Sequence, residues 1–585
     1  MSAASLFSPL KLWANPIFRR YLRARLRLTG LSVGIILTLM VSGFFFFGIR
    51  VIASVQGNMS QVDAERTPLI PLMALQALIL FFLGTGQVAG GMTAEADEGV
   101  IDYQRLTPLS PLAKVFGYLF GLPIREYIMA ACTLPFTAWA LWRGQVPAGA
   151  WMAVYAVFLS SAVLYHLTGL VAGTVVKNRR WAFLVSIGVV FALYTVIPQA
   201  AKFGLTTFKY LTVWPVFEEN ILHLLPRAAS GAVRLAQKMS PEVRFFGLSF
   251  SETVFTLFSQ SGLILTFVVM LWRRWRQPEA HLLGKLWAVG LMAWTQIMLL
   301  GNALPLIVPG LIFPSREFQR RLYQSAGWRP TVSEGVAMIG LYGLVALGLM
   351  LVLILIITPT LDGQARGWHR ARKLGITRPP WHSDAATALW FVLALALTGT
   401  AGWSVFAHEL IGSHWFAGVA LPAWTPAVFA LVLLTAGVAF HALLEHWGGR
   451  AVFLAVVFAG AAPAMAGAVL AAASNWGDGW LTLAMWVSGI SPLSAPIFAT
   501  QTLLPKTDLS LAAARSIPLA FWFWQSLLLL AAAALARLLW LGRKKARFRS
   551  LTAAAAAVIS SAQNSDDLPL LPPGKTPAAD PSGNP

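Results

Sequence analysis

Long apolar runs alternate with short polar segments along nearly the whole chain. A bilayer core about 30 Å thick is crossed by roughly 20 apolar residues in helical form, and the pattern predicts about twelve such crossings. The predicted spans are residues 28–52, 69–91, 116–141, 151–176, 181–199 and 251–272, then 286–313, 334–357, 385–406, 425–444, 451–473 and 517–541. We therefore predict an all-α polytopic membrane protein.

Lys and Arg cluster in alternate connections between these spans, at residues 177–180, 273–276, 358–384 and 543–549. Short cytoplasmic loops of membrane proteins carry an excess of such cations. We therefore place these connections and both chain termini on the cytoplasmic side. The connection 314–330 is also basic, although this orientation places it outside, and it weighs against the assignment.

The two halves follow the same plan, which predicts two six-span repeats at residues 29–280 and 281–545. Each half has a Pro-interrupted outer segment before its last span, at Trp214-Pro215 within the segment 200–250 and at Ser491-Pro492. The last spans also contain similar tripeptides, Ser259-Gln260-Ser261 and Trp524-Gln525-Ser526. Chance similarity between two Leu-rich runs is the alternative. Matching span numbers and loop polarity favour duplication.

Two terminal segments fall outside the spans. Residues 1–28 contain Arg19, Arg23 and Arg27 at every fourth position with apolar residues between them. This pattern predicts a basic amphipathic helix on the membrane lipids of the cytoplasmic leaflet. Residues 546–585 are Ala-rich and then rich in Pro, Ser and Asp, which predicts a disordered cytoplasmic tail.

Composition supports the membrane class. The chain of 585 residues is 57% hydrophobic and 11% charged, whereas soluble domains carry about 25% charged residues. The net charge of +21 is explained by cations at span ends, so it does not indicate nucleic-acid binding. Cys132 is the one cysteine, which excludes an internal disulfide and a cysteine metal site.

The segment 92–114, MTAEADEGVIDYQRLTPLSPLAK, is unusually acidic for this chain and lies between two apolar runs. It cannot lie in hydrocarbon, so we predict a polar loop or surface helix. As a helix, it would place Glu95, Glu98 and Asp102 on one face and would end at Pro108. A solvated loop without a partner is the alternative for such a charge run.

This segment resembles the cytoplasmic loop after the second span of ABC-2 type transporter permeases. Val100 stands where that family usually has Thr, and Gln104 and Arg105 stand where Leu is common. The opening Asn15-Pro16-Ile17-Phe18-Arg19-Arg20 is also similar to that family, with Tyr21 in place of the usual Glu. The matching positions are Glu95, Asp97, Gly99, Asp102, Leu106, Pro108 and Ser110.

The resemblance implies the membrane-spanning permease of an exporter in the cell (inner or plasma) membrane, and not an enzyme. A separate ABC ATP-binding subunit, expected as a dimer, would bind and hydrolyse ATP, and this chain would hold no cofactor. The chain has no G-x-x-x-x-G-K-[ST] phosphate loop, which agrees with this division. The residues expected to couple to the ATPase are Glu95, Asp97, Glu98, Gly99, Asp102, Leu106 and Pro108.

Other chemistry is less well supported by the residues. Arg125 and Glu126 lie inside a predicted span, where a structural role at the membrane interface and a role in gating are the two alternatives. As neighbours on a helix they point in different directions. The pair His441 and His446 lacks metal-ligand spacing, and both residues are expected to be solvated or interfacial. An ion-coupled secondary transporter, with Glu126 as its main buried acid, is the alternative function. A membrane enzyme that modifies lipids or glycans is a third.

Overall fold

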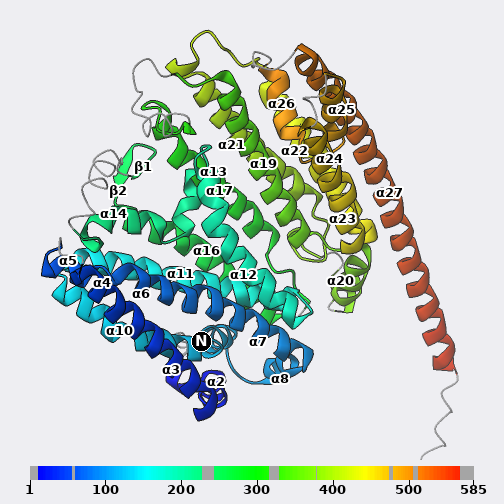
Figure 1. The fold of residues 1–585 in the computed structure, drawn as a ribbon. Coiled ribbons are helices and arrows are strands. Elements are labelled where there is room, and N and C mark those ends of the chain that lie inside the picture. The colour runs from blue at the N-terminus through cyan, green and yellow to red at the C-terminus, as the bar shows by residue number, and fades with distance from the viewer. Residues whose placement is uncertain are drawn as a thin grey trace, which may run out of the picture.

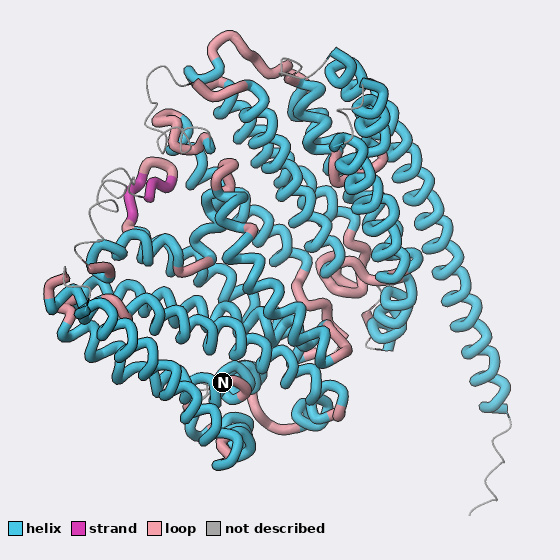
Figure 2. The backbone as a smooth tube through the Cα atoms, in the orientation of Figure 1, coloured by secondary structure: helices cyan, strands magenta, loops and turns pink. Residues whose placement is uncertain are grey.

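The structure is a computed structural model, and it describes residues 11–55, 59–226, 243–277, 279–314, 329–373, 375–376, 379–472, 478–504 and 511–566. Within these ranges the chain is mostly α-helical, with one two-stranded antiparallel hairpin. Figures 1 and 2 show long helices side by side, with short connections at their ends. The predicted all-α architecture is therefore confirmed.

The first half contains the N-terminal helix α2, the helices of the first six predicted spans, and the hairpin β1–β2. Four short elements accompany them: the 3-10 turns η2 (Leu12–Ala14) and η5 (Thr206–Leu211), and the π turns η3 (Phe44–Gly48) and η4 (Leu78–Gly84). The elements are α2 (Pro16–Arg25), α3 (Leu28–Gly43), α4 (Ile49–Val55), α5 (Gln61–Arg66), α6 (Leu69–Ala77), α7 (Thr85–Asp97), α8 (Val100–Leu106), α9 (Pro111–Gly121), α10 (Ile124–Arg143), α11 (Ala148–Val175), α12 (Arg179–Thr195), α13 (Ile197–Ala201), α14 (Trp214–Leu224), β1 (Val243–Phe245), β2 (Leu248–Phe250) and α16 (Glu252–Arg276).

The second half packs beside the first and ends in the long helix α27, which extends beyond the rest of the molecule (Figure 1). Its elements are α17 (Lys285–Ile307), α19 (Val332–Ile357), α20 (Leu361–Lys373), α21 (Leu389–Ile411), α22 (Thr425–Trp447), α23 (Gly449–Ala455), α24 (Ala462–Ala472), α25 (Asp478–Gly489), α26 (Ala495–Leu503) and α27 (Leu511–Asp566).

Among the described residues, 10 helical segments are long and apolar enough to cross a membrane. Each overlaps one of the predicted spans, so the multi-pass class is supported. They are Gly30–Val55, Gln61–Asp97, Ala148–Val175, Glu252–Arg276, Lys285–Ile307, Val332–Ile357, Leu389–Ile411, Thr425–Trp447, Gly449–Ala472 and Ala514–Lys544.

The other two predicted spans are helical but shorter or interrupted. The span predicted at 116–141 is divided between α9 and α10, because Pro123 has no N–H with which to continue the hydrogen bonds of α9. The span predicted at 181–199 contains α12, which has 17 residues. The total of twelve spans and the cytoplasmic placement of the termini stay predictions.

Side-chain caps fix where several of these helices begin. Asn15 accepts hydrogen bonds from the backbone N–H groups of Ile17 and Phe18 at the start of α2. Ser110 and Ser251 cap α9 and α16 in the same way. These side chains satisfy N–H groups that have no partner inside the helix.

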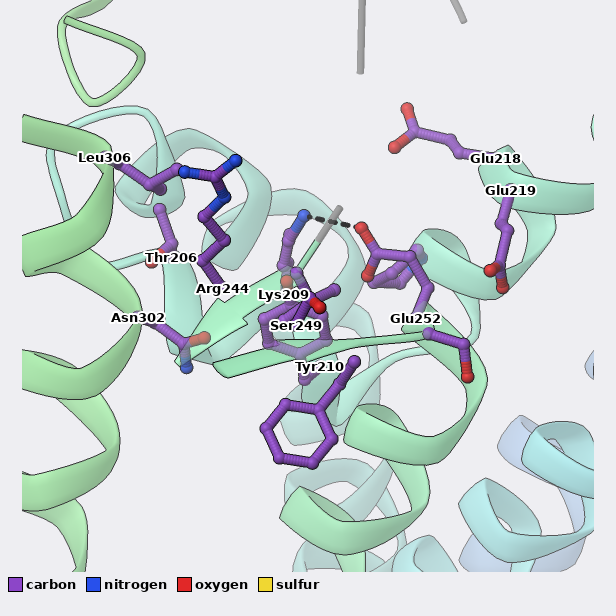
Figure 3. Close-up of a pocket in the computed structure, with 14 residues that line it drawn as sticks. Thr206, Lys209, Tyr210, Glu218, Glu219, Arg244, Ser249, Glu252, Asn302 and Leu306 are labelled. Carbon is purple, nitrogen blue, oxygen red and sulfur yellow. Dashed lines mark hydrogen bonds and ion pairs between the residues drawn. The ribbon is translucent and has the colours of Figure 1, made fainter. Parts of the chain in front are cut away.

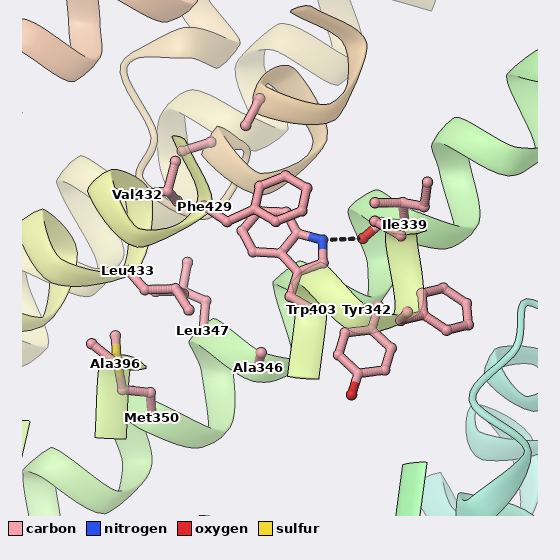
Figure 4. Close-up of a cluster of buried hydrophobic side chains, with 14 of the residues drawn as sticks. Ile339, Tyr342, Ala346, Leu347, Met350, Ala396, Trp403, Phe429, Val432 and Leu433 are labelled. Carbon is pink, nitrogen blue, oxygen red and sulfur yellow. Dashed lines mark hydrogen bonds between the residues drawn. The ribbon is translucent and has the colours of Figure 1, made fainter. Parts of the chain in front are cut away.

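The largest apolar core lies in the second half, between α17, α19, α21 and α22. Figure 4 shows Trp403 at its centre, stacked on Phe429 with ring centroids 3.7 Å apart. The Trp403 indole N–H donates to the Ile339 carbonyl at 2.8 Å, so the buried polar group is satisfied. A Cβ atom at Gly343 would lie 2.3 Å from the Trp403 ring, so this glycine makes room for the indole.

The C-terminal segment differs from its prediction. α27 continues to Asp566, whereas disorder is expected from residue 546. The run of Ala at 553–557 has high helix propensity, and it lengthens a helix that the last span has already nucleated. The remaining part of the predicted tail, residues 567–585, lies outside the described residues.

Candidate functional site

Residues 92–114, predicted to couple to an ATPase and called here the coupling segment, fold as a bend between two helices. Gly99 follows α7 with a left-handed backbone, φ +71°, before α8 begins. Only glycine adopts this conformation readily, and the helix breaks there. Glu95 and Asp102 therefore lie on different helices, so the prediction that they share one helical face with Glu98 is wrong.

The Glu95 carboxylate points into the protein, where it joins α7 to α2 and α9. Its Oε1 atom accepts hydrogen bonds from the Arg20 guanidinium and the Tyr21 hydroxyl. Its Oε2 atom accepts one of 2.6 Å from the Tyr118 hydroxyl. The Glu95 side chain is 12% exposed. Its direct role is therefore to hold the N-terminal helix in place.

Tyr21 occupies the position where the resembled family usually has Glu. Burial and the neighbouring Glu95 carboxylate raise the pKa of Tyr21 well above its ordinary value. The hydroxyl therefore stays protonated and donates to Glu95. A second carboxylate there would repel the first, so the departure from the family pattern fits this local structure.

Close backbone packing adds to this attachment of α2. The Asn15 side-chain amide donates to the Ala113 carbonyl at 2.6 Å. Cβ atoms placed on Gly117 and Gly121 of α9 would lie 2.9 Å from Asn15 and Tyr21 respectively. Side chains at these two glycines would push α2 away, so α2 and α9 form one packed unit with the end of α7.

The bend of the coupling segment is exposed. The surface of Asp97, Glu98, Asp102, Tyr103 and Leu106, called here the bend surface, combines three acids with two large apolar side chains. Tyr103 is 70% exposed and Leu106 is 84% exposed. Gly99 and Pro108, also predicted as coupling residues, are exposed beside it. The sequence prediction did not include Tyr103.

Arg125 and Glu126 contact one another although they are neighbours in the sequence. The Arg125 Nη2 atom lies 2.9 Å from Glu126 Oε1, although neighbouring positions on a helix point in different directions. Two long side chains can bend toward each other even when their Cβ atoms diverge. The Glu126 side chain is 2% exposed, and its Oε2 atom has no hydrogen-bond partner among the described residues.

His166 is a buried polar residue that the sequence analysis did not identify. It lies beside the π turn η4 (Leu78–Gly84), where its Nε2 atom lies 2.9 Å from the Leu80 carbonyl oxygen. Its Nδ1 atom lies 2.8 Å from the Tyr127 hydroxyl. A Cβ at Gly84 would be 2.5 Å from the imidazole. The widened turn and this glycine together accommodate the ring.

A second buried ionic group lies between α22 and α27. Glu445 is fully buried and receives two hydrogen bonds of 2.6 Å from the Arg543 guanidinium. Arg543 also donates to the Thr387 hydroxyl at 2.6 Å. His441 is 1% exposed, with its Nε2 atom 3.2 Å from the Glu445 carboxylate. The burial of His441 contradicts the expectation of a solvated histidine, and its place at a membrane interface stays a prediction.

The two halves meet in an ionic junction made by Arg273, His281, Lys285 and Asp384. The Arg273 guanidinium at the end of α16 contacts the Asp384 carboxylate at 3.0 Å, and the His281 backbone N–H donates to it at 3.1 Å. The Lys285 ammonium donates to the carbonyls of Ser383 and Ala386 at 2.6 and 2.5 Å. The junction ties the connection before α21 to the first half.

A cavity of about 520 Å³ lies at the other end of α16 from the coupling segment. Glu252 lines it at the start of α16, whereas Trp275 at the helix end stacks on Tyr118. A helix of 25 residues separates the two regions by roughly 37 Å. The topology predicted from the sequence places this end of α16, together with the segment 200–250, on the outer side of the membrane.

Charged groups of both signs line this cavity (Figure 3). The Lys209 ammonium contacts the Glu252 carboxylate at 3.4 Å and lies 4.8 Å from the Tyr210 ring centroid. Burial by itself lowers the pKa of Lys209, but Tyr210 and Glu252 raise it above its ordinary value. Lys209 therefore stays protonated. Arg244 belongs to the hairpin and Glu218 belongs to α14, and the two lie on opposite sides of the cavity.

No group of three or more His, Cys, Asp or Glu side chains within the described ranges is placed to hold a metal ion. Comparison with known proteins assigns no family: no family model, no curated protein and no solved structure matches this chain.

Proposed function

We propose that this chain is the permease subunit of an ATP-driven ABC-2 type exporter in the cell (inner or plasma) membrane, energised by a separate ATP-binding subunit. The bend surface carries this proposal. Apolar side chains as exposed as Tyr103 and Leu106, set among acids outside the predicted spans, are typical of a protein-binding site. The sequence pattern of residues 92–114 suggests which partner binds there.

The contacts of the coupling segment provide a route for movement from that partner to the membrane helices. The Lys114 ammonium lies 3.4 and 3.3 Å from the carbonyl oxygens of Arg105 and Thr107, so α8 is tied to the start of α9. Glu95 ties the end of α7 to α2 and α9. A displacement of α8 would therefore move α2, α7 and α9 together.

A recurring contact between helices supports the internal duplication and the two-unit organisation that we propose. In the sixth predicted span of the first unit, the Gln260 amide donates to the Ser161 hydroxyl of the fourth span at 2.9 Å. In the sixth span of the second unit, the Gln525 amide donates to the Thr435 hydroxyl of the fourth span at 2.6 Å. In both units, a Gln of the sixth predicted span therefore donates to a hydroxyl of the fourth.

The second unit has a different surface at the place of the bend. α20 lies between its second and third predicted spans, and its exposed side chains include Arg366, Arg370, Arg372 and Lys373. We propose that a dimeric ATPase would contact an acidic bend on one unit and a basic helix on the other. The two contacts would then differ in their dependence on salt.

An ion-coupled secondary transporter is the second candidate function, and buried titratable side chains favour it. Glu126 and His166 are 1% and 0% exposed, and Glu445 is also fully buried. Ionisable groups at membrane depth are candidates for carrying a coupling ion. Each already has hydrogen-bond or ionic contacts that account for its place in the fold, so we give the exporter priority.

Affinity purification of the tagged chain from native membranes tests the proposal. We expect a P-loop ATPase to co-purify with the wild type and to be lost when Asp97, Glu98 and Leu106 are all replaced by Ala. Glu95 stays unchanged because its replacement would disturb α2. The matched control is Glu409→Ala, which removes an exposed acid near the end of α21, on the predicted outer side and away from both proposed contacts.

The absence of any ATPase with the wild type, in a detergent that preserves other membrane complexes, would contradict the exporter. Transport assays of the Glu126→Gln and His166→Gln variants under an ion gradient would then test the second candidate. Retention of the ATPase by the triple variant would leave the exporter standing but remove the bend surface as its contact.

A further inference from the structure

The cavity at the predicted outer end of the molecule is assembled from both halves of the chain. α14, the turn η5 (Thr206–Leu211), the hairpin β1–β2 and the start of α16 supply most of its lining, and Asn302 and Leu306 of α17 complete it. Its volume of about 520 Å³ falls in the range of small-molecule sites. It lies at the opposite end of α16 from the coupling segment, so ATPase docking does not explain it.

Charges of opposite sign are separated across this cavity. Arg244 projects from the hairpin beside Leu306 of α17, while Glu218 and Glu219 lie on α14 at the opposite side (Figure 3). A surface that carries acids on one side and a guanidinium on the other fits a ligand with the complementary arrangement. A ligand with only a positive charge would be repelled by Arg244. A ligand with only a negative charge would be repelled by Glu218 and Glu219.

The floor of the cavity leaves polar atoms without partners. Glu252 Oε1 contacts the Lys209 ammonium, but Glu252 Oε2 has no hydrogen-bond partner among the described residues. The Thr206 hydroxyl, also buried in the lining, has none in that part of the chain either. Buried polar atoms are usually satisfied, so both atoms mark unused hydrogen-bonding capacity in residues that line the cavity.

We propose that this cavity binds a small zwitterion that carries a primary ammonium and a phosphate or carboxylate group. The ammonium lies toward Glu218, Glu219 and the floor carboxylate, and the anionic group lies toward the Arg244 guanidinium. Arg presents a planar fork of donors that matches such an anion. A soluble amino compound and the phosphoethanolamine headgroup of a lipid share this chemistry.

Titration of the full-length purified chain in detergent with O-phosphoethanolamine tests the inference by calorimetry. Ethylamine and inorganic phosphate serve as probes that carry one of the two charges. We expect O-phosphoethanolamine to bind more tightly than either, and Arg244→Gln and Glu218→Gln each to weaken it by about tenfold or more. Arg143→Gln and Glu409→Gln, which change exposed residues away from the cavity, should leave binding unchanged.

A second experiment, with lipids as ligands, identifies whether the zwitterion is a lipid headgroup or a soluble compound. Native mass spectrometry would compare phosphatidylethanolamine with phosphatidylcholine of the same acyl chains, because a trimethylammonium cannot donate hydrogen bonds. Binding of phosphatidylethanolamine alone, lost in the Arg244→Gln and Glu218→Gln variants, supports the site with a lipid ligand. Binding of free O-phosphoethanolamine with the same dependence supports it with a soluble one.

Three results would overturn the inference. They are no binding in either arm, binding that both cavity variants retain, and equal binding of the single-charge probes. The inference does not depend on an ATPase partner, since every measurement uses the chain alone. Loss of the zwitterion site therefore leaves the exporter proposal unchanged, and failure of ATPase co-purification leaves this site unchanged.

Discussion

Glu95 and Asp97 are two positions apart, yet their carboxylates have different environments. Glu95 accepts hydrogen bonds from Arg20, Tyr21 and Tyr118, whereas Asp97 is exposed. Within the predicted coupling segment, one acid therefore serves the fold, while the other is free to meet solvent or a partner. Substitutions that combine the two acids would mix loss of the fold with loss of a contact.

Replacing Glu95 with Gln should destabilise the protein by about 2 kcal/mol. A Gln amide turns one acceptor into a donor, which would face hydroxyl and guanidinium donors and leave one unsatisfied. Chemical denaturation in mixed micelles, followed by circular dichroism, measures the change. Asp97→Asn should stay within about 0.5 kcal/mol of wild type because Asp97 is exposed. Equal effects of the two substitutions would contradict the role given to Glu95.

At the scale of elements, the bend between α7 and α8 depends on one backbone position. Gly99 has φ +71°, and a Cβ placed there would have no atom within 4 Å. Space around this residue is therefore free, and the restriction on a substitution comes from the backbone conformation alone. The angle between α7 and α8 sets the orientation of the bend surface.

Gly99→Ala should cost about 1 kcal/mol of folding free energy, because alanine disfavours a left-handed backbone. It should also lower the amount of ATPase that co-purifies, since relief of the strain would reorient α8. Gly99→Asn is the matched control because Asn tolerates this conformation better. Both quantities come from the denaturation and co-purification assays described above. A Gly99→Ala variant that matches Gly99→Asn in both would show that the bend does not need its left-handed residue.

At the scale of the whole molecule, the ionic junction joins the two halves at the end of the bundle that carries the coupling segment. Arg273 belongs to the last helix of the first half, and Asp384 belongs to the connection before α21 of the second. The outer cavity is also built from both halves, at the opposite end of α16. Relative motion of the halves would therefore change both regions.

A double-mutant cycle of Arg273→Gln and Asp384→Asn should give a coupling free energy of about 1 kcal/mol, because this pair is about a quarter exposed. The pair Arg370 and Glu279 is about 60% exposed on both sides and serves as the comparison. Its coupling should stay below about 0.5 kcal/mol, since solvent screens it. The same denaturation assay supplies all values. Equal couplings for the two pairs would show that the partly buried Arg273–Asp384 contact holds the halves together no better than an exposed ion pair does.

Part of the site could be predicted from sequence because it depends on local pattern. The acids of residues 92–114 interrupt apolar runs, and such an interruption must lie outside hydrocarbon. Gly99 has a local cause too, because glycine readily adopts the left-handed backbone that this position requires. Tyr103 was missed because its exposure is set by how α8 packs. Exposure of an aromatic residue on a short helix has no sequence signal.

The sequence alone determined the all-helical membrane class and the position of most long helices, since each span must satisfy its own backbone hydrogen bonds within one continuous apolar run. Only the tertiary structure decided which polar side chains are buried together. Glu95 with Arg20, His166 with Tyr127, and Glu445 with Arg543 each join residues at least 39 positions apart in the chain. Pairing over such distances depends on how helices pack, and no local pattern along the chain encodes it.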